Sequence, residues 1–141
     1  MAIIFHTEDI IFRFSNKKII RSWINRVSTR HYKEVGDINY IFCSDAKILE
    51  INKQFLNHDY YTDIISFDYS EINIISGDIY ISIDTVKSNA LKFGVLFKEE
   101  LHRVIIHGVL HFLGYKDKTK ADSENMRRLE NESLQILNTL L

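Results

Sequence analysis

The stretch His107-Gly-Val-Leu-His-Phe-Leu-Gly-Tyr-Lys-Asp117 decides how this chain can fold and what it can bind. Residues four apart on a helix share one face with Cβ atoms about 6 Å apart, so His107 and His111 can point at one cation. Gly114 suits the left-handed position just past a helix end. A chain that reverses there can bring Asp117 back to the same cation. The spacing therefore predicts a metal site with two nitrogen ligands and one oxygen ligand.

Zinc is the metal that this ligand set favours first. It prefers four tetrahedral ligands, and catalytic zinc sites leave the fourth position to water or substrate. Another divalent metal stays possible, because two histidines and one carboxylate also bind iron in non-haem oxygenases. A histidine pair alone also occurs on ordinary amphipathic helices. Zinc proteases carry Glu directly after the first histidine, and Gly108 at that position argues against peptide hydrolysis.

The helix expected over residues 97–113 carries apolar side chains on nearly every face, which predicts burial at the centre of the molecule with the histidines at the floor of a cleft. Gly108 in its interior costs about 1 kcal/mol relative to Ala, which close approach of another segment or of substrate would explain. His102 lies about 140° around the helix from His107 and is not expected to be a ligand. We see no partner for His6 or His31.

Hydrophobic periodicity and capping residues divide the rest of the chain. Ser44 or Asp45 can cap one helix, Asp84 another, and Thr119 opens a capping box. Turns are expected at Gly36-Asp37 and at Gly77. The predicted strands cover 3–7, 38–43, 64–69 and 78–83, and the predicted helices cover 16–31, 44–56, 84–94, 97–113 and 119–139.

Length and composition fit one domain over residues 1–141 with a sizeable core. Apolar residues make up 45% and charged residues 26%, as in ordinary soluble proteins. No apolar run is long enough for a transmembrane helix, and the first residues do not form a signal peptide. Cys43 is the single cysteine, which excludes an internal disulfide and suggests a small buried side chain. We expect a cytoplasmic monomer without a membrane partner.

The net charge of −1 argues against bulk electrostatic binding to nucleic acid, so any RNA contact must come from local basic patches. Solvated helix faces are the plain alternative for such clusters. The first candidate patch comprises Lys17, Lys18, Arg21, Arg26, Arg30 and Lys33, and the second comprises Lys116, Lys118, Lys120, Arg127 and Arg128.

The opening stretch resembles the signature of the YbeY family of metal-dependent endoribonucleases, His-Gly-x-Leu-His-Leu-x-Gly-Tyr-Asp-His. The third ligand of that signature is a histidine, and Asp117 stands at its position here. Asp is a competent zinc ligand. The positions in register are His107, Gly108, Leu110, His111, Gly114 and Tyr115.

Other blocks extend the resemblance over roughly residues 44–137. Residues 51–67 resemble the family's Leu-Asn-x-x-Tyr-Arg … Asp-x-Pro-Thr-Asp-Val-Leu-Ser-Phe block. The matching positions are Asn52, Asp59, Thr62, Asp63, Ser66, Phe67, the run Gly77-Asp-Ile79, and Met126 with Glu130 of a closing Met-x-x-x-Glu pattern.

Two departures from the family pattern stand out. The family's arginine falls at Leu56, and leucine cannot hold a phosphate. The function of that arginine is then either absent or taken over by another residue. Lys53 and His58 are candidates because they lie close to position 56 in the sequence. The proline before Thr-Asp is Tyr61.

The resemblance implies an α+β fold, with a mixed four-stranded sheet covered by helices and a buried central metal-binding helix. It implies a Zn²⁺-dependent endoribonuclease that acts on single-stranded RNA of the small ribosomal subunit, in 16S rRNA 3′-end maturation and ribosome quality control. The alternative is a ribosome-associated assembly factor with a structural metal and little or no nuclease activity. Leu56 at the family's arginine position supports this alternative.

In the nuclease interpretation, His107, His111 and Asp117 hold the metal, whose open position lowers the pKa of a bound water. Lys116 or Lys118 could neutralise charge on the phosphate. By resemblance, Asp63 and Ser66 are cleft candidates. Asp63 could instead cap a loop, and Ser66 could simply point out of a strand. A general base is not evident.

Overall fold

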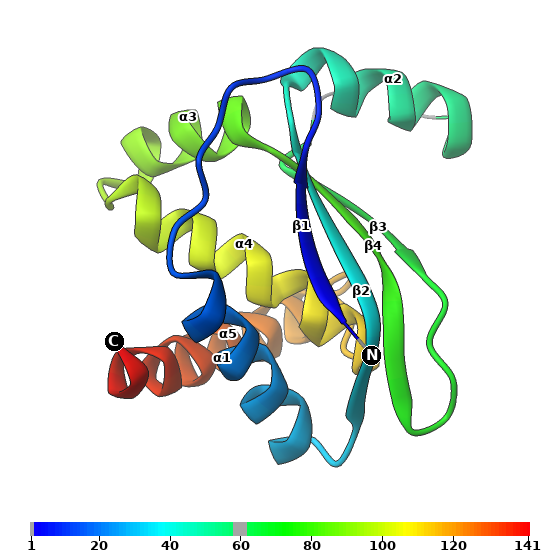
Figure 1. Cartoon of the computed structure of the whole chain (residues 1–141), viewed down its shortest axis with the longest axis vertical. Helices are drawn as coiled ribbons and strands as arrows, with labels where there is room; N and C mark the ends of the chain where they lie inside the picture. The colour runs from blue at the N-terminus through cyan, green and yellow to red at the C-terminus, as the bar shows by residue number, and fades with distance from the viewer. Residues whose placement is uncertain (1, 58–61) are drawn as a thin grey trace.

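The computed structural model describes residues 2–57 and 62–141, in which four strands form one sheet with the order β1-β2-β4-β3 (Figure 1). β1 and β4 both run parallel to β2, whereas β3 pairs antiparallel to β4. The expected α+β architecture with a mixed sheet is therefore confirmed. The strands are β1 (Ile3–Thr7), β2 (Glu34–Cys43), β3 (Ile64–Asp68) and β4 (Ile74–Ser82).

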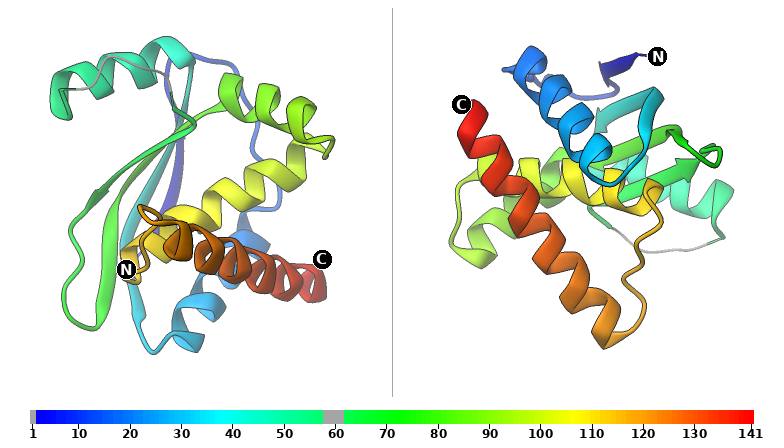
Figure 2. Two further views of the ribbon diagram at one scale, coloured as in Figure 1. Left: turned by 180° about the vertical axis from the view of Figure 1, so that it is seen from behind. Right: turned by 90° about the horizontal axis from the view of Figure 1, so that it is seen from below.

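Helices cover the two faces of the sheet unequally, as the views in Figure 2 show. α1, α4 and α5 lie on one face, where their apolar stripes form the larger core together with the inward side chains of β2 and β4. α2 packs on the other face against a small cluster that includes Cys43, whose burial raises its thiol pKa to about 12. The helices are α1 (Lys17–Arg30), α2 (Asp45–Phe55), α3 (Ile83–Phe93), α4 (Phe97–Phe112) and α5 (Lys120–Leu140).

α4 lies between the sheet and α5, buried on most of its surface as its apolar sequence predicts. The Tyr40 hydroxyl of β2 donates to the Ile105 carbonyl at 3.0 Å and ties the helix to the sheet. A Cβ added to Gly108 would lie 2.8 Å from Cδ1 of Ile79 and 3.3 Å from Cδ1 of Ile64. The glycine therefore lets α4 approach β3 and β4 closely, and no substrate is needed to explain it.

Two predicted turns are wrong, because each glycine serves a strand. Gly36 lies inside β2, where the pairing register shifts between Val35 and Ile38. Gly77 lies in the middle of β4, and a Cβ there would stand 2.3 Å from the Phe67 carbonyl oxygen and 2.5 Å from the Phe112 ring. In both places glycine permits close approach within the sheet.

The helix ends follow local sequence signals, with one correction. The Ser44 hydroxyl caps α2 by accepting from the Lys47 N–H at 3.2 Å, and Thr119 forms the expected capping box of α5. The cap of α3 is Ser82, which accepts from the Thr85 N–H, and Asp84 lies within the first turn. None of the helices in the described ranges is long and apolar enough to cross a membrane.

Candidate metal centre

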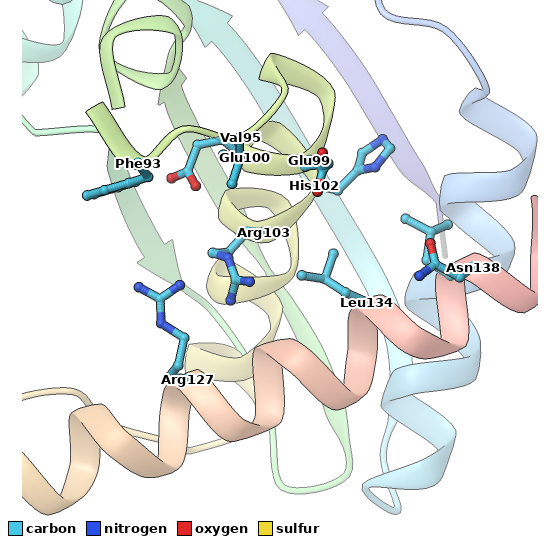
Figure 3. A pocket seen from close by; sticks show the side chains of 10 residues that line it. Phe93, Val95, Glu99, Glu100, His102, Arg103, Arg127, Leu134 and Asn138 are labelled. Atoms are coloured by element: carbon cyan, nitrogen blue, oxygen red, sulfur yellow. The ribbon is translucent and has the colours of Figure 1, made fainter. Parts of the chain in front are cut away.

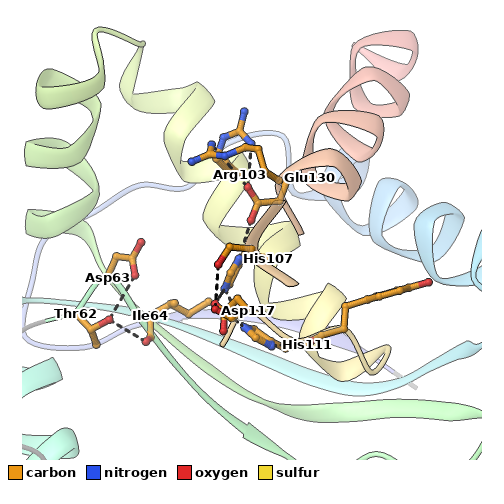
Figure 4. A network of polar contacts seen from close by, with 11 residues as sticks. Thr62, Asp63, Ile64, Arg103, His107, His111, Asp117 and Glu130 are labelled. Carbon is orange, nitrogen blue, oxygen red and sulfur yellow. Dashed lines mark hydrogen bonds and ion pairs between the residues drawn. The ribbon is translucent and has the colours of Figure 1, made fainter. Parts of the chain in front are cut away.

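The end of α4 brings His107, His111 and Asp117 together, as their spacing predicted (Figure 4). The Nε2 atoms of the two histidines are 2.9 Å apart. Gly114, with φ of +105°, turns the chain back after the helix. Oδ2 of Asp117 then lies 3.3 Å from Nε2 of His107 and 3.4 Å from Nε2 of His111. These three residues are called the His-His-Asp group below.

The Nδ1 atom of each imidazole makes a hydrogen bond within the protein. Nδ1 of His107 donates to Oε2 of Glu130 at 2.7 Å, and Nδ1 of His111 donates to the Tyr115 carbonyl oxygen at 3.0 Å. With its proton on Nδ1, a neutral imidazole presents an acceptor lone pair at Nε2. Two such lone pairs and a carboxylate oxygen therefore converge on one point, which suits a cation.

The donor set fits a zinc-sized ion. Tetrahedral ligands at about 2.0–2.2 Å from zinc lie about 3.3 Å from one another, close to the three separations found here. The residues contribute three ligands, which leaves one tetrahedral position without a protein donor in the described part of the chain. The His-His-Asp group could thus hold a metal ion.

Glu130 on α5 contacts this group through Nδ1 of His107, the ring nitrogen that does not face the candidate metal position. It is buried, and it accepts from Nδ1 of His107 and from Nη1 of Arg103 at 2.9 Å. Burial would raise the Glu130 pKa, but these two hydrogen bonds and the two positive charges lower it overall. For His107, burial lowers the pKa, and the hydrogen bond and charge of Glu130 outweigh burial and raise it. Such outer contacts fix the orientation and basicity of histidine ligands.

The His-His-Asp group lies in an open cleft of about 430 Å³ between α4, α5 and the start of β3. Asp63 and Ser66, the two cleft candidates named from the resemblance, are among the residues that line this cleft. Burial raises the Asp63 pKa, which keeps this carboxyl readier to hold a proton than an exposed one. Lys116 is exposed and is not among the described residues that line the cleft, so its role stays a prediction.

Several other residues that line the cleft were not predicted to lie in it. Arg103 comes from α4, Arg127 from α5, and Phe93 from the end of α3. Glu100 also lines it, and burial followed by the charge of Asp63 raises its pKa. The family resemblance had already singled out Glu130 through the closing Met-x-x-x-Glu pattern, and the structure shows that its carboxylate contacts His107.

Other predicted residues lie away from the His-His-Asp group. His102 packs edge-on against Trp23, with ring centroids 6.1 Å apart, and is no part of the group. Leu56 follows the end of α2 and is not among the described cleft residues. Lys53 lies on the last turn of α2. His58, Asp59 and Tyr61 lie outside the described residues.

The expectation that His6 and His31 have no partner is wrong. Nε2 of His6 contacts Oδ1 of Asn39 at 3.1 Å, and Nδ1 of His31 contacts the Tyr115 hydroxyl at 2.8 Å. Both partners are distant in sequence, so no local pattern reveals them. The His31 contact holds the same Tyr115 whose carbonyl oxygen orients His111.

Fold and site together define an α+β protein with a candidate three-ligand metal centre on the floor of an open cleft. A family model described as Endoribonuclease YbeY matches residues 2–138. The chain belongs to the YbeY family of endoribonucleases.

Curated relatives named Endoribonuclease YbeY match over nearly their whole length. The relative from Parabacteroides distasonis is 54% identical, and the match covers 97% of this chain and 96% of the relative. One from Bacteroides fragilis is 51% identical, with 95% and 96% covered. The solution structure of a Thermotoga maritima protein has a TM-score of 0.65 and 27% identity, and covers 98% of this chain and 93% of its own.

Proposed function

We propose that this protein is a zinc-dependent endoribonuclease that cuts single-stranded RNA, acting in 16S rRNA 3′-end maturation and ribosome quality control. The observation that carries the proposal is the convergence of three acceptor atoms of the His-His-Asp group, within 3.4 Å of one another, in an open cleft. The names of the relatives support the reaction class.

His107, His111 and Asp117 would hold the ion, which would supply Lewis-acid polarisation of a phosphodiester. Glu130 and the Tyr115 carbonyl hold the Nδ1 protons, so both imidazoles keep their Nε2 lone pairs aimed into the cleft. These fixed partners remove the need to reorganise the site during the reaction.

Asp63 is the side chain that we assign to proton transfer. It lines the same cleft, and its raised pKa allows its carboxyl to carry a proton toward a leaving oxygen. Ser66 lines the cleft on β3 and can donate a hydrogen bond to the RNA backbone. Lys116 lies on the exposed segment after α4, where it would contact an RNA phosphate outside the cleft.

The second candidate function is a ribosome assembly factor with a structural metal, favoured by Leu56 at the family's arginine position. Against it, the largely exposed Arg127 lines the cleft, so positive charge there does not depend on position 56. A structural site would also be closed by four protein ligands, whereas three are found among the residues that the structure describes.

Metal analysis of purified protein, combined with a single-stranded RNA cleavage assay, tests the proposal. We expect about one zinc per chain, cleavage that stops with a chelator, and recovery on adding zinc. His111→Ala should lose both metal and cleavage while its circular dichroism stays unchanged. Cleavage at the wild-type rate by scrupulously metal-free protein would refute the mechanism, and metal binding without cleavage would favour the assembly factor.

A further inference from the structure

We infer that Arg127 and Phe93 form a nucleotide subsite beside the His-His-Asp group, on the premise that the chain acts on single-stranded RNA as proposed above. Arg127 would bind the phosphate of the flanking nucleotide, and Phe93 would stack on its base. The subsite is built from the protein's own side chains and acts without the metal.

Among the described cleft residues, Arg127 is the cation that is available to a phosphate. The other cleft arginine, Arg103, is committed: its guanidinium donates to Glu130 at 2.9 Å and to Asn131 at 3.0 Å. Arg127 only approaches Glu130 to 3.9 Å, and its side chain is 59% exposed. A guanidinium with unused donors is well suited to bind a phosphate through two hydrogen bonds.

The cleft needs such a cation. Its lining includes Asp63, Glu100, Asp117 and Glu130, and these carboxyl groups would repel an RNA backbone. Figure 3 shows Arg127 extending from α5 toward Phe93 and Glu100. Of the second basic patch expected from the sequence, Arg127 is the member found among the described cleft residues.

Phe93 supplies the aromatic surface. It is the last residue of α3, it is 54% exposed, and it lines both the cleft and an adjoining hollow between α4 and α5. Glu100, Arg103 and Arg127 line both spaces as well, so the two hollows are neighbours that share part of their walls. An exposed aromatic ring beside a cation in a groove is the arrangement that binds single strands by stacking and backbone attraction.

Fluorescence anisotropy on chelator-treated protein at low salt tests the subsite directly. The probes are a labelled 12-nucleotide oligoadenylate and an abasic phosphodiester oligomer of the same length. We expect Arg127→Gln to weaken both probes and to reduce the slope of log affinity against log salt by about 0.7, as for one lost phosphate contact on a single strand. We expect Phe93→Leu to weaken the oligoadenylate about fivefold or more and to leave the abasic oligomer unchanged.

Matched controls separate these effects from general changes in charge or surface. Arg128→Gln removes the same charge from the next residue of α5, which is 60% exposed and pairs with Glu132. Tyr69→Leu removes an aromatic ring that is 64% exposed beyond the end of β3. Both controls should bind the two probes like the wild type.

The results distinguish the subsite from the proposed function. An unchanged salt slope in Arg127→Gln, equal effects of Phe93→Leu on both probes, or no binding by the chelated wild type would each overturn the subsite. If the wild type binds as expected but never cleaves RNA with zinc, the nuclease proposal fails and the subsite stands. If it cleaves, both variants should raise KM and leave kcat within about twofold, since they bind away from the reacting phosphate.

Discussion

Nδ1 of His107 lies 2.7 Å from Oε2 of Glu130, a contact that joins α4 to α5 across 23 positions of the sequence. The pair is largely buried, and Arg103 holds the same carboxylate from the other side. Glu130 thus fixes the ring orientation and the tautomer of one candidate metal ligand. It does so without being a ligand itself.

Replacing Glu130 should therefore weaken metal binding. We expect Glu130→Gln to lower zinc affinity about 10- to 100-fold, because the amide keeps the shape but loses the charge that favours the correct imidazole tautomer. Competition with a chromophoric chelator measures this effect. Glu132→Gln is the matched control, because Glu132 is exposed on the same helix and pairs with Arg128. Equal zinc affinity for Glu130→Gln and the wild type would contradict the orienting role.

Zinc should stabilise the folded protein through the His-His-Asp group. At a free zinc concentration 100 times Kd, linkage gives about 2.7 kcal/mol of added stability. Thermal melts with and without zinc should show this increase in the wild type and lose it in His111→Ala. His6→Ala is the control, because His6 is exposed on β1 and contacts Asn39. A zinc-induced rise in Tm that survives His111→Ala would place the ion elsewhere.

Asp63→Asn tests proton transfer separately from metal binding. We expect kcat to fall about 100-fold, the lower range for a lost general acid or base, with zinc affinity unchanged. Asp68→Asn, at the other end of β3 and exposed, should cleave RNA at the wild-type rate. A variant at position 63 with full kcat would remove Asp63 from the mechanism.

Gly77→Ala should be strongly destabilising. Its added methyl group would collide with the Phe67 carbonyl oxygen, which belongs to the paired strand and cannot move alone. We expect a loss of about 3 kcal/mol or more in urea denaturation, at the upper end for overpacking. Gly94→Ala is the control: it has open space and φ of +68°, so the cost should be about 1 kcal/mol. Similar losses at both positions would mean that Gly77 is not a close-packing site.

Stability should fall in mild acid because of His102. Burial, assisted by the charge of Lys98, lowers its pKa to about 4 from an ordinary value of 6.5. Between these values the unfolded chain binds a proton that the folded protein does not. Stability is therefore lost as pH falls from 6.5 to 4, by about 3 kcal/mol in total. Urea denaturation at pH 7 and pH 5 should show a smaller difference in His102→Gln than in the wild type.

Sequence alone located the His-His-Asp group because all three residues fall within one short stretch. Helical pitch aligns His107 with His111, and Gly114 reverses the chain before Asp117, so each step is local. The caps Ser44 and Thr119 were predicted for the same reason. Strand and helix periodicity likewise located the elements, while the family resemblance supplied their arrangement as a mixed sheet.

Only the tertiary structure decided what surrounds that group. Gly36 and Gly77 were misread as turns, because glycine's local preference for turns was overruled by close contacts between strands. The pairing of Glu130 with His107, and the arrival of Arg127 and Phe93 at one cleft, depend on how α5 and α3 pack against α4. Burial of the apolar helix faces determines how separate helices pack. The polar side chains that become neighbours through this packing cannot be inferred from residue spacing along the chain.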